Sequence, residues 1–213
     1  MSVFWFQMAV SLDGYVAGPD QSEQDPLGVG GMRLHEWVFE LEAWRSQMGE
    51  EGGEVNASTQ VVVEARTNVG AVVMGRNMFG GGPGPWREDP PWNGWWGDDP
   101  PYHAPVFVVT HHPREPLEMA GGTTFWFVTD GIEAALERAR DAAGERDVLL
   151  GGGADVANQY LRAGLLDEFE LHVAPVLLGA GERLFVDVGS PELRQVRVIE
   201  APGVTHVKYL VVR

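Results

Sequence analysis

The stretch "VLLGGGADVANQYL", residues 148–161, decides the predicted fold. A short apolar run enters three consecutive glycines and continues into Val156, Ala157, Tyr160 and Leu161, which recur at helical spacing. This order is typical of a strand, a tight turn and the start of a helix. Such a turn aligns free backbone N–H groups with the positive end of the helix dipole, which suits a phosphate. Close packing of strand against helix explains the glycines alone equally well.

The chain alternates between apolar strands and amphipathic helices through its first three quarters. Strands are expected over 2–11, 71–75, 105–110, 123–129 and 147–150, and helices over 34–48, 57–67, 131–143 and 154–163. Asn56 and Asp130 are expected to cap the second and third helices. The β-rich remainder ends in a hairpin across Pro202 and Gly203. The pattern predicts an α/β fold with a mostly parallel central sheet, helices on both faces and a C-terminal antiparallel hairpin.

Residues 80–101 interrupt this alternation. They hold Trp86, Trp92, Trp95 and Trp96 among many prolines and glycines, a composition that fits no regular element. We expect either a lid that presents indoles to a planar ligand or an arm that contacts a second subunit. Since no linker is long enough to divide the chain, residues 1–213 are expected to form a single domain with an insertion at about 80–101.

Composition excludes several function classes. A formal net charge of −16 opposes binding to nucleic acid and to anionic membrane surfaces. The absence of cysteine excludes disulfides and Cys-ligated metals, and the neighbouring His111 and His112 lack further ligands at metal-binding spacing. No G-x-S-x-G elbow points to a serine hydrolase. No basic segment precedes the apolar start, and no run approaches the roughly 18 apolar residues of a membrane span. We therefore expect a soluble, cytoplasmic protein with no metal site.

Unusual turns follow three of the expected strands. They lie at Asp13-Gly14, at Gly75-Arg76-Asn77 and at Gly151-Gly152-Gly153. Ligands of open α/β sheets bind outside the carboxyl ends of strands, so these turns are expected to line one crevice. Arg76 is placed to clamp a phosphate, and its alternative role is to pair with a surface carboxylate. A dry Asp13 would have a raised pKa suited to proton donation, whereas an aspartate bonded to its own turn is the alternative.

Two further polar segments are weaker candidates. The turn 110–114 offers a hydroxyl and nitrogen donors to a 2′-phosphate, although on its own it is more typical of a polar turn. His35 and Glu36 begin the next expected helix, where they either face the same crevice or cap the helix.

Four segments together resemble the dihydrofolate reductase-like superfamily, in particular the branch containing the reductase domain of the bacterial riboflavin-biosynthesis deaminase/reductase. They are "AVSLDGYVAG" (9–18), "VVMGRNMF" (72–79), "VFVVTHHP" (106–113) and the block 149–185, in which G-G-G, L-L-D-E and P-V-L-L-G keep the family's order. The resemblance implies a three-layer sandwich and a homodimeric NADPH-dependent reductase. Its planar heterocyclic substrate would be pterin-like or similar to 5-amino-6-(5-phosphoribosylamino)uracil.

The resemblance also implies roles for individual residues. The cofactor phosphates would contact Gly75, Arg76 and Asn77, the 2′-phosphate would contact Thr110 and His111, and the diphosphate and nicotinamide would contact Gly151, Gly152, Gly153, Asp155 and Val156. Substrate would meet Asp13, Tyr15, His35 and Trp37, with Asp13 or Glu36 as the proton source. Tyr15 departs from the family, which usually carries a basic residue there to hold a ribose phosphate. The alternative function is a nucleotide-binding homodimer without turnover.

Overall fold

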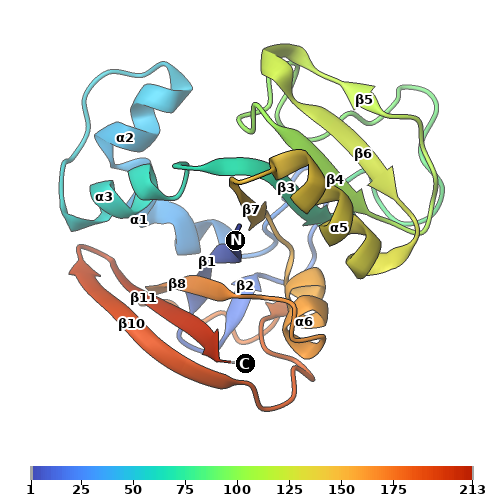
Figure 1. Ribbon diagram of the computed structural model, residues 1–213. Helices are drawn as coiled ribbons and strands as arrows, with labels where there is room; N and C mark the ends of the chain where they lie inside the picture. Colours follow the sequence, from blue (N-terminus) through green and yellow to red (C-terminus); the bar gives the residue numbers. More distant parts are fainter. Residues whose placement is uncertain (1, 213) are drawn as a thin grey trace. The chain divides into compact units, whose positions relative to one another are not determined.

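The structure is a computed structural model that describes residues 2–212. The chain forms two compact units, each assembled from two separate stretches of sequence. Unit 1 comprises Met1–Phe6 and Asn68–Leu166, and unit 2 comprises Gln7–Thr67 and Asp167–Arg213. Strand β1 (Phe4–Ser11) begins in unit 1 and ends in unit 2 (Figure 1). The single-domain organisation stays a prediction.

Unit 1 contains a largely parallel sheet. Its strands follow the order β1, β7 (Asp147–Leu150), β3 (Val69–Gly75), β4 (Pro105–Val109), β6 (Thr124–Val128) and β5 (Leu117–Glu118). Neighbours are parallel except β5, which runs antiparallel to β6. The helical elements are α4 (Arg76–Phe79), η3 (Ala120–Gly122), α5 (Gly131–Ala143) and α6 (Ala154–Arg162). The strands and helices predicted for this part of the chain are confirmed, and β5 was not expected.

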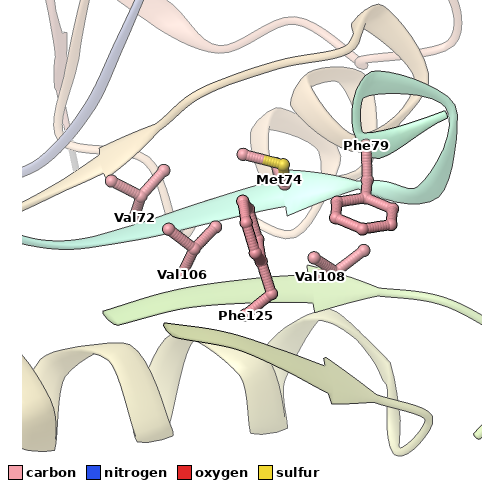
Figure 2. Close-up of a cluster of buried hydrophobic side chains, with 6 residues drawn as sticks. All are labelled: Val72, Met74, Phe79, Val106, Val108 and Phe125. Atoms are coloured by element: carbon pink, nitrogen blue, oxygen red, sulfur yellow. The ribbon is translucent and has the colours of Figure 1, made fainter. Parts of the chain in front are cut away.

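The core of unit 1 lies against β3, β4 and β6. It is a cluster of buried side chains from these strands and from α4 (Figure 2): Val72, Met74, Phe79, Val106, Val108 and Phe125. Valines favour strands because their branched side chains pack well on a pleated surface. Both faces of β3 are buried, as expected for a central parallel strand.

Residues 80–101 pack onto this core without forming a regular element. The indole N–H groups of Trp86, Trp92 and Trp95 donate to the carbonyl oxygens of His112, Phe79 and Met78 at 2.8, 2.9 and 2.9 Å. Trp96 stacks on Phe125 with ring centroids 6.0 Å apart. The predicted lack of regular structure is confirmed, and the core packing accounts for these indoles without an exposed lid or arm.

Unit 2 is built on antiparallel strands. β10 (Glu192–Ala201), β11 (Val204–Val212) and β8 (Glu168–Ala174) lie in that order beside β1, and a separate pair is formed by β2 (Tyr15–Ala17) and β9 (Glu182–Arg183). The hairpin across Pro202 and Gly203 is confirmed. The helical elements are η1 (Gly31–His35), α1 (Glu36–Phe39), α2 (Glu42–Arg45), η2 (Ser46–Met48) and α3 (Ala57–Glu64).

The prediction of one helix over 34–48 is wrong. Leu41 adopts an extended conformation, with φ −76° and ψ 134°, and separates α1 from α2. The returning chain bonds on both sides of this break, since Glu54 N–H donates to Glu40 and Glu42 N–H donates to Glu54. The apolar spacing still identified the buried residues Leu34, Val38 and Leu41, because successive short turns repeat with nearly the period of a helix.

The two predicted caps have different outcomes. Asn56 caps α3, since its side chain accepts the backbone N–H of Ser58 at 2.9 Å. Asp130 stands at the cap position of α5, but its carboxylate binds Arg138 at 2.8 Å and makes no cap hydrogen bond. No helix of the described residues is long and apolar enough to cross a membrane.

Candidate functional site

Three neighbouring strands of unit 1 end at the same edge of the sheet. β7, β3 and β4 are adjacent and parallel, so the turns that follow them lie side by side. These turns and the start of α6 contain every residue predicted to bind the cofactor: Gly75, Arg76, Asn77, Thr110, His111, Gly151, Gly152, Gly153, Asp155 and Val156. The structure therefore brings these residues to one edge, and their binding role stays a prediction.

Close packing explains part of this glycine pattern. Gly75 N–H donates to the Gly152 carbonyl at 2.7 Å, and a Cβ on Gly75 would lie 2.7 Å from Cγ2 of Val156. Gly152 has φ +117°, which side chains other than glycine rarely adopt. A Cβ on Gly153 would instead meet nothing within 4 Å. Packing thus accounts for Gly75 and Gly152, whereas Gly153 leaves open space above the backbone.

Helix α6 starts directly beyond that open position. Gly153 is its N-cap and makes no side-chain cap hydrogen bond. The first backbone N–H groups of α6 therefore face outward at the positive end of the helix. Val156 is buried against Gly75, and Asp155 is exposed and accepts a hydrogen bond from Gln159 at 2.8 Å.

Arg76 follows β3 directly and lies flat on an indole. Its guanidinium carbon is 3.1 Å from the centroid of the Trp86 ring. Nη2 donates to the carbonyl oxygens of Gly82 at 2.8 Å and Gly81 at 3.4 Å. Nε and Nη1 are buried and have no hydrogen-bond partner within residues 2–212. Burial, followed by the charge of Arg114, lowers the pKa of Arg76 to about 10. The alternative of a surface arginine paired with a carboxylate is therefore wrong.

The turn after β4 is more occupied than its sequence suggests. Thr110 is buried, and its hydroxyl accepts the N–H of His112 at 3.2 Å. His111 is exposed. The hydroxyl is thus engaged within its own turn, as the polar-turn interpretation predicts.

The expectation of a raised pKa at Asp13 is wrong. Its carboxylate accepts the backbone N–H groups of Leu178 at 3.1 Å and Gly179 at 2.7 Å. The hydrogen bond from the Ser11 side chain, together with these backbone bonds, lowers the pKa of Asp13 to about 2. The apolar neighbours of Asp13 in sequence do not surround its carboxylate. Asp13 is therefore ionised at neutral pH and ties the turn after β1 to the loop after β8.

Tyr15 has a basic neighbour that the sequence did not reveal. Arg183 pairs with Tyr15 across β2 and β9, with its guanidinium carbon 5.0 Å from the centroid of the tyrosine ring. Arg183 also donates to the Asp13 carbonyl at 2.9 Å. The residue that departs from the family pattern thus lies beside a cation supplied by a distant part of the chain.

The three candidates at η1 and α1 have different surroundings. Glu36 is exposed. Burial lowers the pKa of His35, and its Nδ1 has no hydrogen-bond partner within the described residues. Trp37 donates its indole N–H to Leu34 at 3.0 Å. Its ring meets His172 and His206 edge to face, with centroids 5.1 and 5.0 Å away.

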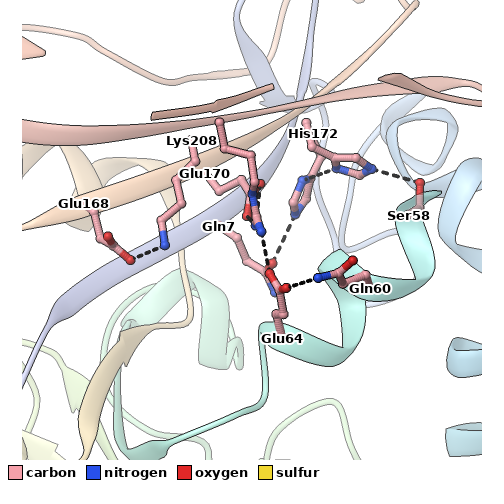
Figure 3. Close-up of polar contacts among 10 residues, drawn as sticks. Gln7, Ser58, Gln60, Glu64, Glu168, Glu170, His172 and Lys208 are labelled. Carbon is pink, nitrogen blue, oxygen red and sulfur yellow. Dashed lines mark hydrogen bonds and ion pairs between the residues drawn. The ribbon is translucent and has the colours of Figure 1, made fainter. Parts of the chain in front are cut away.

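A buried polar chain runs through unit 2 beneath Trp37 (Figure 3). Ser58 Oγ lies 2.9 Å from His206 Nε2, His206 Nδ1 lies 2.8 Å from His172 Nδ1, and His172 Nε2 lies 3.2 Å from Gln7 Oε1. Both histidines are neutral, since burial lowers their pKa values and nearby positive charge adds to the effect. Sequence reasoning missed this chain because its members come from four separate elements.

The fold and its edge of glycine turns define a dihydrofolate reductase-like α/β protein. A putative riboflavin biosynthesis protein from Shewanella sp. PV-4 is 21% identical with a TM-score of 0.63, over 99% of both chains. Dihydrofolate reductase from Enterococcus faecalis, solved with NADP(H), is 13% identical with a TM-score of 0.53, over 98% of this chain and 96% of that one. The predicted fold class is confirmed.

More particularly, the RibD C-terminal domain family matches residues 3–207, and the chain belongs to this family. Among curated relatives, YyaP of Bacillus subtilis (strain 168) is 39% identical over 62 residues, or 29% of this chain. The matched segment spans 32% of the length of YyaP. The predicted family is confirmed, and membership supports a reductase-type function.

Proposed function

We propose that the protein is an NADPH-dependent reductase that transfers a hydride to a planar heterocycle of the pterin or aminouracil type. The observation that carries this proposal is the strand-end edge of unit 1, where Arg76 has no carboxylate partner and Gly153 leaves the backbone open. The bound nicotinamide would supply the hydride. Family membership supports the reductase class.

The residues of this edge fit the phosphates of a dinucleotide. A buried guanidinium with unpartnered N–H groups is costly, and an anion that bonds to them relieves the cost. The carbonyl groups of Gly81 and Gly82 offer only neutral acceptors, whereas phosphate oxygens form stronger, charge-assisted hydrogen bonds. Arg76 and Asn77 would hold phosphate, and the first turn of α6 would face the diphosphate.

The residues of unit 2 take modified roles in this proposal. Asp13 remains a site residue, but as an ionised group that orders the loop at Leu178 and Gly179. Glu36 is then the remaining proton source, acting through water. Tyr15 and Arg183 together suit a substrate that joins a planar ring to an acidic group.

Thermal unfolding with NADPH, NADH or no nucleotide tests the proposal. A ligand at 100 times its dissociation constant stabilises the native state by about 2.7 kcal/mol, so a clear rise in melting temperature is expected with NADPH. Turnover is then measured as loss of the reduced nicotinamide absorbance with pterins, aminouracils and quinones. No shift with either nucleotide would contradict the proposal. A shift without turnover on any substrate would favour a nucleotide-binding protein without catalysis.

Arg76→Ala is expected to weaken both nucleotides, and NADPH more than NADH. Loss of a hydrogen bond to a charged group costs about 1.5–3 kcal/mol, which corresponds to roughly tenfold or more in dissociation constant. Isothermal titration calorimetry measures the change. Arg45→Ala is the matched control, because it removes the same charge from an ion pair with Glu50 in unit 2. An equal effect of the two substitutions would remove Arg76 from the site.

A further inference from the structure

Arg114 is a second arginine beside Arg76, and neither has a carboxylate partner within residues 2–212. In a chain with 31 acidic and 15 basic residues, two neighbouring arginines without a carboxylate are unexpected. The repulsion between them is real, since the charge of Arg114 contributes to the lowered pKa of Arg76. Ion pairs elsewhere, such as Arg138 with Asp130, show that carboxylates do pair with arginine in this chain.

Trp86 holds the two guanidinium groups together. The Arg76 guanidinium carbon is 3.1 Å from its ring centroid, and the Arg114 carbon is 5.4 Å from the same centroid. The indole is itself fixed by its hydrogen bond to His112 and by edge-to-face contacts with Phe79 and Phe127, at 5.6 and 4.9 Å. Stacking on an aromatic face lets two like charges share one region that water fills poorly.

Segment 80–101 also fixes the far end of Arg114. Nη1 of Arg114 donates to the Trp92 carbonyl, and Nη2 donates to Asn93 Oδ1 at 2.8 Å. Arg114 further lies 5.2 Å from the ring of Phe127. The guanidinium is thus positioned by neutral groups that leave its charge uncompensated.

A paired-arginine site favours a doubly charged anion. A phosphate monoester carries close to two negative charges at neutral pH, whereas each phosphate of a diphosphate bridge carries one. A dianion would offset both guanidinium charges and offer acceptors to the orphaned Nε and Nη1 of Arg76. Because those atoms are covered in this structure, the Arg76 side chain must move on Trp86 when the anion binds.

Sheet order separates this site from the glycine turn. Arg114 follows β4, which lies two strands from β7, and neighbouring strands are roughly 4.8 Å apart. A phosphate at Arg114 and a diphosphate at Gly153 are therefore different groups. NADPH carries both, since its adenosine ribose bears a 2′-phosphate that NADH lacks.

We propose that Arg114, held beside Arg76 by Trp86, binds a phosphate monoester and thereby selects NADPH over NADH. The inference rests on the proposed function for the identity of the nucleotide. Segment 80–101 is then the element that builds this selectivity, because it provides Trp86 and positions Arg114.

The test measures dissociation constants of wild type and Arg114→Gln for NADPH, NADH, 2′,5′-ADP, 5′-AMP and inorganic phosphate. Glutamine keeps hydrogen-bond donors for Trp92 and removes the charge. We expect NADPH and 2′,5′-ADP to weaken about tenfold or more, equivalent to about 1.4 kcal/mol, with NADH and 5′-AMP changed less than about twofold. Arg114→Lys should retain part of the selectivity, and Arg45→Ala should retain all of it.

The outcomes separate this inference from the proposed function. Equal weakening of NADPH and NADH by Arg114→Gln, or no change in either, overturns the inference while the nucleotide site stands. Binding of 2′,5′-ADP that depends on Arg114, without binding of NADPH or NADH, supports the anion site and removes the proposed function. Equal affinity of wild type for inorganic phosphate and 2′,5′-ADP overturns selection of a nucleotide.

Discussion

Lowering the pH from 7 to 5 is expected to destabilise the native state by up to about 4 kcal/mol, because His172 and His206 are buried as neutral side chains. Their native pKa values lie below the unfolded value of about 6.5. Below that pH the unfolded chain binds more protons than the native one, so stability falls as pH falls. Each histidine contributes up to about 1.4 kcal/mol per pH unit.

Urea unfolding at pH 7, 6 and 5 measures this slope. The range avoids most carboxylate titration, including that of Glu64, whose pKa is lowered chiefly by a hydrogen bond from Arg197. Replacing His172 by glutamine should reduce the slope by about half. His103→Gln is the control, since the His103 side chain is 58% exposed and should leave the slope unchanged. A wild-type stability that stays flat from pH 7 to 5 would show that the histidines are not buried as neutral groups.

Phe79→Ala is expected to cost about 3–5 kcal/mol of stability. Phe79 is fully buried at the end of α4 and packs with Met74, Val108 and Phe125 (Figure 2). Its ring also meets Trp86 edge to face, so the substitution removes support beneath the indole that holds Arg76. The measurements are urea unfolding and NADPH affinity, and both should fall.

Phe79→Leu is the matched variant for that prediction. Leucine fills most of the space, so the loss should be smaller than for alanine. A cost below about 1 kcal/mol for alanine would mean that residues 80–101 do not depend on this core cluster.

The sequence predicted those elements whose residues contact near neighbours in the chain. The stripe of Ile132, Leu136 and Ala139 specified α5 to the residue, because an amphipathic helix repeats its pattern locally. The spacing from Leu34 to Trp44 was just as regular, yet it does not form one helix. Hydrogen bonds from Glu54 break the turn at Leu41, and no local pattern reports a strand-like segment that returns from ten residues away.

The candidate site divides in the same way. The turns at Gly75 and Gly151–Gly153 were found because glycine beside an apolar run is itself a signal. The state of Asp13 was missed because Leu178 and Gly179, which hold its carboxylate, lie about 165 residues further along the chain. Arg183 beside Tyr15 and Trp86 beneath Arg76 were missed for the same reason, since each contact depends on tertiary structure.

The path of the chain through β1 sets an order for its folding during synthesis. When residue 166 leaves the ribosome, unit 1 has all its strands, whereas unit 2 still lacks β8, β10 and β11. Ala9 and Leu34 must wait for Ala174 and Val176 before their shared cluster can form. The nascent N-terminal half of unit 2 therefore carries uncovered apolar side chains while its neighbour is already folding, and this interval is where chaperones would act on the protein.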